Sequence, residues 1–151
     1  MKKSVVAVVV TLLSATAFAQ SVKEKKAWDK IDEESKAAAK YIKEKCGADV
    51  SITPDKKSWN TVELAEGPAR WCISEAQSAL GSLCDDADYK AAVAKNVKKI
   101  TCVMDAKLPN TGSADLYGNK LSLKGGTVEW RYHKDSSNLG DNITKFLKEN
   151  L

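Results

Sequence analysis

Proline, glycine and histidine are scarce in this chain of 151 residues, which has 3 prolines, 8 glycines and a single histidine. This scarcity, with 43% hydrophobic and 29% charged residues, excludes a wholly disordered or collagen-like chain. The 24 basic and 20 acidic residues nearly balance, so the sharp basic bias of a dedicated nucleic-acid-binding protein is missing. The length suits one domain.

Long apolar runs are missing too, and none reaches the roughly 20 residues that a helix needs to cross a bilayer. The short run Val5–Leu13 follows two lysines and precedes an A-F-A motif that ends at Ala19. This order is typical of a secretory signal peptide. We therefore expect residues 1–19 to be cleaved, and residues 20–151 to form one exported domain in the periplasm or outside the cell.

All four cysteines lie in the expected mature part, and an even number in an exported chain predicts two disulfides. Their spacing lacks the close pairs of a zinc site and the C-x-x-C of a redox dithiol. The cysteines are Cys46, Cys72, Cys84 and Cys102.

Helix geometry limits how these cysteines can pair. Cys72 and Cys84 fall on one predicted helix about 18 Å apart, whereas disulfide-bonded residues have Cα atoms within about 7 Å. The remaining pairings are 46–72 with 84–102, and 46–84 with 72–102. We favour the second, because the helix after Cys84 is expected to return antiparallel along its predecessor, which would bring Cys102 to Cys72.

Apolar spacing predicts helices over residues 22–45, 68–83 and 87–97, and a last helix around Ile143 and Leu147. Asp85-Asp86 and Asp141 are expected to supply the N-caps of the last two helices. Alternation predicts strands over 48–53 and 100–104, whereas residues 55–66 fit either a loop or a further strand.

The clearest local signal is Gly125-Gly126, a two-residue hairpin turn. This turn opposes Leu123 to Val128, Leu121 to Trp130, and Asn119 to Tyr132, which gathers apolar residues on one face. A second turn at Gly118-Asn119 would add a strand through Ala114 and Leu116. The fold class expected is α+β, with helices on a three- or four-stranded antiparallel sheet closed by a C-terminal helix.

Catalytic signatures are weak. His133 stands near Asp135 and Ser136, but sequence adjacency alone does not make a triad, so we expect a solvated surface histidine. The acidic groups lie in charged, exposed stretches where nothing would tune a carboxyl for acid catalysis. They are Asp29, Asp32, Glu33, Glu63 and Glu66.

No segment fits a metal or cofactor template. The acidic residues Asp85, Asp86 and Asp88, and the run 135–140, both lack the ligand positions of a calcium loop. Lys124–Thr127 lacks the spacing of a phosphate-binding loop. We expect no catalytic residue, no cofactor and no metal.

We expect most of the four tryptophans, Trp28, Trp59, Trp71 and Trp130, in the core, with Trp71 on the apolar side of the helix over residues 68–83. Trp59 has the least clear period and is therefore the candidate for an exposed partner contact. The favoured function is a non-catalytic secreted or periplasmic binding domain, either an inhibitor or an envelope accessory protein. Its partner would be a protein or envelope component, not a nucleic acid. The alternative is a small secreted hydrolase that uses carboxylates or His133.

Overall fold

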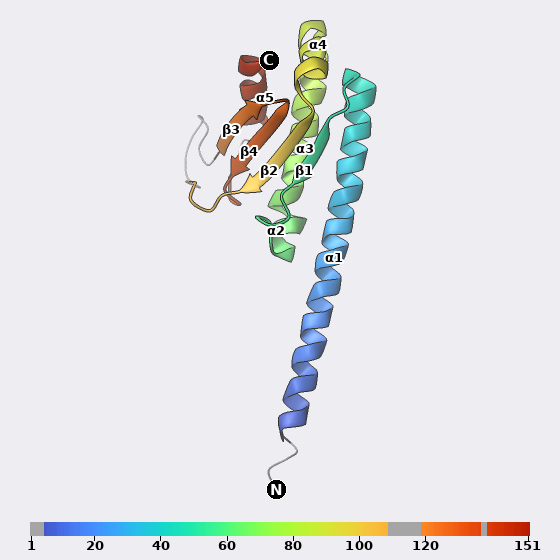
Figure 1. The fold of residues 1–151 in the computed structure, drawn as a ribbon, viewed down its shortest axis with the longest axis vertical. Helices are drawn as coiled ribbons and strands as arrows, with labels where there is room; N and C mark the ends of the chain where they lie inside the picture. The colour runs from blue at the N-terminus through green and yellow to red at the C-terminus, as the bar shows by residue number, and fades with distance from the viewer. Residues whose placement is uncertain (1–4, 109–118, 137–138) are drawn as a thin grey trace.

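The computed structural model describes residues 5–108, 119–136 and 139–151, with side chains from Val22 onward (Figure 1). The helices are α1 (Val5–Cys46), α2 (Val62–Glu66), α3 (Pro68–Leu83), α4 (Ala87–Asn96) and α5 (Leu139–Asn150). The strands are β1 (Ser51–Pro54), β2 (Lys99–Met104), β3 (Asn119–Lys124) and β4 (Thr127–Tyr132). The protein is therefore α+β and ends in a helix. Within the described residues, no helix has the length and apolar character required to cross a membrane.

The sheet is mixed, so the predicted antiparallel sheet is wrong. Its strand order is β1-β2-β4-β3, and β2 runs parallel to both β1 and β4. Helices α2, α3 and α4 carry the chain from the end of β1 back to the start of β2, which is the crossover that parallel neighbours need. Only β3 runs antiparallel to its neighbour, β4.

The predicted hairpin is confirmed residue by residue. Asn119, Leu121 and Leu123 pair with Tyr132, Trp130 and Val128. Both turn glycines have positive φ, 57° and 79°, which explains why this turn requires glycine. The predicted strand through Ala114 and Leu116 lies outside the described residues.

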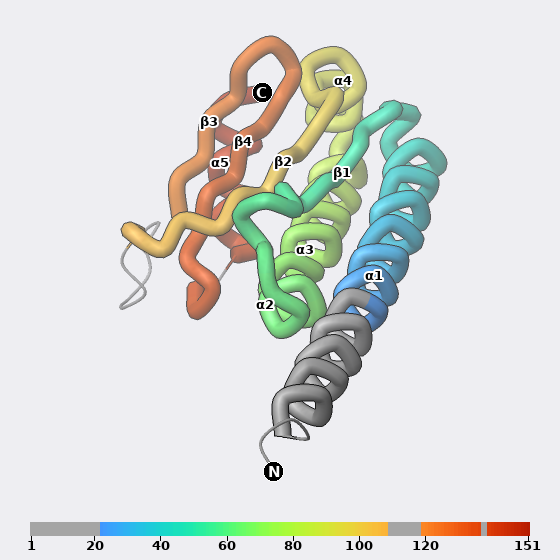
Figure 2. The backbone as a smooth tube through the Cα atoms, turned by 60° about the horizontal axis from the view of Figure 1, so that its bottom comes forward, coloured from blue at the N-terminus to red at the C-terminus, as the bar shows by residue number. Residues whose placement is uncertain are grey.

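The four strands bury only one of their two faces. Along β1, β2 and β4 the inward residues are almost all buried, whereas none of the outward residues is. Figure 1 shows α3 and α5 behind the sheet, and Figure 2 shows α1 beside α3. The helices therefore cover the inner face and leave the outer face uncovered by any described helix.

Several helix boundaries follow the predicted signals. Helix α3 spans the predicted residues, with Pro68 in its first turn. Asp86 caps α4, since its carboxylate accepts the N–H groups of Asp88 and Tyr89. Asp141 is not an N-cap, because α5 begins two residues earlier. The ambiguous segment 55–66 forms turns followed by α2, not a further strand.

The structure contains the disulfides Cys46–Cys84 and Cys72–Cys102, the pairing favoured from the sequence. Their Cα atoms are 5.3 and 6.1 Å apart. The expected antiparallel return of α4 is not what brings Cys102 to Cys72. Figure 1 shows α4 beyond the end of α3, and it is strand β2 that runs back along α3. Cys102 thereby reaches the first turns of α3.

Three aromatic residues form a cluster in the core. Trp59 and Trp130 both pack on Tyr132, with ring centroids 5.0 and 5.2 Å from it. The Tyr132 hydroxyl donates a 2.6 Å hydrogen bond to the carbonyl of Pro68. Burial raises the pKa of the Tyr132 phenol far above its ordinary value of 10. The cluster thus ties the start of α3 to the centre of the sheet.

Removing the Cys72–Cys102 disulfide in a Cys72→Ala/Cys102→Ala variant should lower the free energy of unfolding by about 3–4 kcal/mol. The expected size follows from the 30-residue separation that the bond closes. Urea unfolding measures it, with Cys46→Ala/Cys84→Ala as a comparison of similar loop length. Non-reducing peptide mapping that joined Cys84 to Cys102 would contradict the fold.

Candidate functional site

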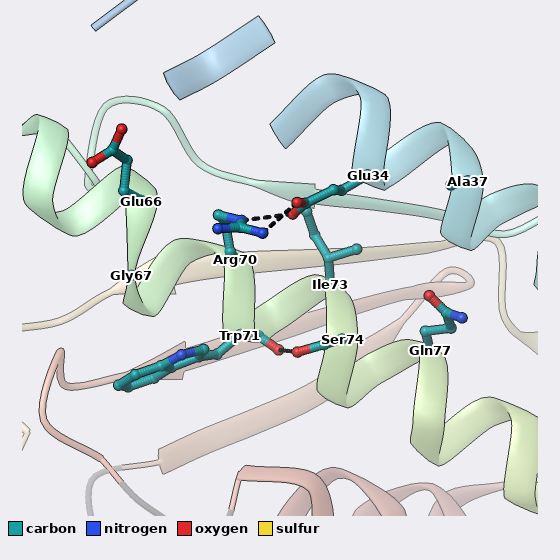
Figure 3. Close-up of a pocket in the computed structure, with 9 residues that line it drawn as sticks. All are labelled: Glu34, Ala37, Glu66, Gly67, Arg70, Trp71, Ile73, Ser74 and Gln77. Carbon is teal, nitrogen blue, oxygen red and sulfur yellow. Dashed lines mark hydrogen bonds and ion pairs between the residues drawn. The ribbon is translucent and has the colours of Figure 1, made fainter. Parts of the chain in front are cut away.

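A groove of about 400 Å³ lies between α1 and α3, beside the end of α2 (Figure 3). Its small and apolar lining comes from Ala37 on α1, Gly67 before α3, and Ile73 on α3. Ala37 and Gly67 have too little side chain to fill the space between the helices. A volume of this size suits a small ligand or one or two side chains of a partner.

An ion pair spans the groove from one helix to the other. The Arg70 Nε of α3 donates a 2.7 Å hydrogen bond to Glu34 Oε2 of α1, and a second guanidinium nitrogen bonds the other carboxylate oxygen. These hydrogen bonds, helped by the charges of Glu34 and Glu66, raise the pKa of Arg70 against the opposing effect of burial. The two-point contact fixes the guanidinium plane and thus one wall of the groove.

Trp71 lies at the edge of this groove with 44% of its surface exposed. Figure 3 shows its indole pointing away from the Glu34–Arg70 pair, along the outside of α3. The prediction that Trp71 lies on the buried side of this helix is therefore wrong. The spacing of the apolar residues could have predicted this exposure. The buried side of α3 contains Ala69, Cys72, Ile73 and Ala76, and helical geometry places Trp71 on the opposite side.

Trp59, the predicted partner contact, is fully buried. Its indole Nε1 donates a 3.1 Å hydrogen bond to the carbonyl of Cys102, and its ring packs on Tyr132. Trp59 is thus a core residue that is hydrogen-bonded to the backbone of β2 at Cys102. Its segment lacks a regular period because it forms turns before α2, where apolar spacing does not follow a helix or a strand.

His133 is more enclosed and better oriented than predicted. Only 14% of its side chain is exposed, and Nδ1 accepts a 3.2 Å hydrogen bond from the backbone N–H of Asp135. The Asp135 carboxylate lies 3.5 Å from the same nitrogen. The N–H of Ser136 donates to the carbonyl of His133, so the three residues share one turn. The prediction of a solvated histidine with no orienting partner is therefore wrong.

The other charged candidates occupy ordinary structural positions. The carboxyl groups of Asp29, Asp32, Glu33, Glu63 and Glu66 are on exposed residues. Asp85 pairs with Lys45, and Lys124–Thr127 forms the hairpin turn with a strand on each side. In the portion of the chain that the structure describes, no three His, Cys, Asp or Glu residues are grouped to hold a metal ion.

The chain matches no model of a protein family, and no curated protein or solved structure is significantly similar to it. The α1–α3 groove is the candidate site on its own geometry. It combines an apolar lining, an ion pair fixed across two helices and an exposed indole at its edge.

The two tryptophans should differ sharply on removal. Trp71→Ala should lower the free energy of unfolding by less than about 1 kcal/mol, because its indole is half exposed. Trp59→Ala should cost about 3–5 kcal/mol, because it empties a core site and removes one of the two hydrogen bonds that the Cys102 carbonyl accepts, the other coming from the Asp55 N–H. Urea unfolding of both variants measures the contrast, and equal losses would place Trp71 in the core.

Proposed function

We propose that this protein is an exported, non-catalytic binding domain that contacts a protein of the cell envelope through the α1–α3 groove. One observation carries the proposal: an exposed tryptophan stands at the edge of a preformed groove beside an arginine held in place. Tryptophan and arginine are enriched among the residues that dominate binding energy at protein interfaces. The groove needs little reorganisation to bind, because the Glu34–Arg70 pair already orders its wall.

Export is supported by the disulfides and by the leader-like start of the chain. Disulfides persist mainly in oxidising compartments such as the periplasm and the extracellular space.

Protein purified from its native envelope should begin at Gln20. The A-F-A motif and the short apolar run before it direct cleavage after Ala19. Intact-mass spectrometry and N-terminal sequencing measure this directly. A main species that retains Met1 would contradict export by cleavage.

Trp71 is the residue whose loss should weaken partner binding most. A photo-crosslinking amino acid at position 71 should form one dominant adduct on envelope extracts, whereas the same group at the exposed Lys90 of α4 should not. For the partner identified in this way, Trp71→Ala should weaken affinity by about 30-fold or more, as for an interface hot spot. Adducts of equal yield at positions 71 and 90, or an unchanged affinity of Trp71→Ala, would contradict the groove as the contact site.

A second candidate function, hydrolysis, is favoured by the oriented His133–Asp135 pair alone. It would show as turnover of ester, peptide or glycoside substrates by the wild-type protein. If His133→Ala reduced that turnover by a factor of about 10²–10⁴ while the fold stayed intact, the non-catalytic proposal would be wrong.

A further inference from the structure

The outer face of the sheet carries an excess of positive charge. Its outward side chains include four basic residues, Lys99, Lys120, Lys124 and Arg131, and one acidic residue, Glu129. Residues 20–151 contain 22 basic and 20 acidic residues in all. The remainder of this expected mature chain therefore has 18 basic and 19 acidic residues, and its whole positive excess belongs to this one face.

The charge is also uneven along the face. Arg131 donates a hydrogen bond to Glu129, and the negative charges of Asp105 and Asp55 also act on its guanidinium group. The positive charge of Arg131 is therefore largely neutralised. The three lysines are exposed, and within the described chain none of them forms a salt bridge. The cationic part of the face is therefore the edge strand β3 together with the end of the sheet at the hairpin turn.

The strand register arranges these groups in rows across the sheet. One row runs Ser51, Lys99, Thr127, Lys124, from β1 through β2 and β4 to β3. The strands of a sheet lie about 4.8 Å apart, so Lys99 and Lys124 flank Thr127 at about 10 Å from each other.

The neighbouring row consists of three hydroxyl side chains and Glu129. The hydroxyl residues are Thr53, Thr101 and Ser122. Two adjacent rows thus present hydroxyl groups and ammonium groups on one face, with Glu129 as the one carboxylate among them.

We propose that this outer face binds an acidic linear polysaccharide laid across the strands. Lys99, Lys124 and Lys120 would contact its anionic groups, and the hydroxyl side chains would hydrogen-bond its sugar hydroxyls. The proposal concerns a surface separate from the α1–α3 groove and does not depend on the function assigned to that groove.

The composition of the face favours a polysaccharide over other polyanions. The exposed large hydrophobic residues are Val22, Tyr41 and Trp71, and none of them belongs to a strand of this sheet. The face therefore has no aromatic anchor of the kind found at protein interfaces and no large exposed apolar residue to enter a lipid bilayer. Its one outward apolar residue, Val103 of β2, is half-buried beside Arg131. Hydroxyl groups in rows match a ligand that is itself rich in hydroxyl groups.

Two triple variants with the same change in net charge test the proposal. Lys99→Gln/Lys120→Gln/Lys124→Gln removes the charges of the face, and Lys30→Gln/Lys36→Gln/Lys90→Gln removes three exposed lysines of α1 and α4. Calorimetry would measure binding to polygalacturonate and dextran sulfate near 0.1 M salt, with neutral dextran as the blank. The face variant should lose affinity by about tenfold or more, and the helix variant by less than about threefold.

Four outcomes would overturn the proposal. These are no binding of either anionic polymer, equal losses in the two triple variants, equal binding of neutral dextran, and binding to phosphatidylglycerol vesicles in place of the polymers. Trp71→Ala should bind the polymers like the wild type, which separates this surface from the groove. Urea unfolding should show all three variants folded, because every replaced side chain is wholly or largely outside the core.

Discussion

The attachment of α3 to the centre of the sheet is the constraint on which the remaining structure depends. Three contacts meet there: the Cys72–Cys102 disulfide, the Tyr132 hydrogen bond to Pro68 and the Trp59 hydrogen bond to the Cys102 carbonyl. They join the segment before α2, the start of α3 and two central strands. These contacts hold the start of α3 against the sheet and so help to set where Arg70 meets Glu34 of α1. The Cys46–Cys84 disulfide joins the other ends of α1 and α3, so both disulfides contribute to the shape of the groove.

The accuracy of prediction from sequence depended on how local each feature is. The Gly125-Gly126 hairpin was predictable in full register, because turn geometry and alternation over a dozen residues leave one register that sorts the apolar side chains. Helix α3 was predictable for a similar reason. The direction of β2 relative to β1 and β4 was not predictable. Helices α2 to α4 separate β1 from β2 in the sequence, and a long segment that includes β3 separates β2 from β4. The alternation of apolar and polar residues identifies a strand, but it does not show which strand pairs with it or in which direction.

The candidate site was less accessible to sequence reasoning than the fold. Trp59 is buried where exposure was predicted, because an irregular segment can still pack into the core. Trp71 is exposed where burial was predicted, because a helix on the surface has one side facing solvent. The position of Trp71 opposite the buried side of α3 could have been predicted from the sequence. The partnership of Glu34 with Arg70 was not, since it joins residues 36 apart on different helices. The orientation of His133 depends on a turn whose backbone geometry no residue type dictates.

Among the described strands, the two outer ones explain how the sheet can avoid growing by edge pairing. At one edge, β1 is four residues long and ends in Pro54, which has no N–H to donate to an incoming strand. At the other edge, β3 carries Lys120 and Lys124 on its outward face. A second copy pairing there would bring like charges together, and charged edge residues are a common defence against aggregation. The same lysines that give the outer face its charge therefore also keep neighbouring molecules from extending the sheet.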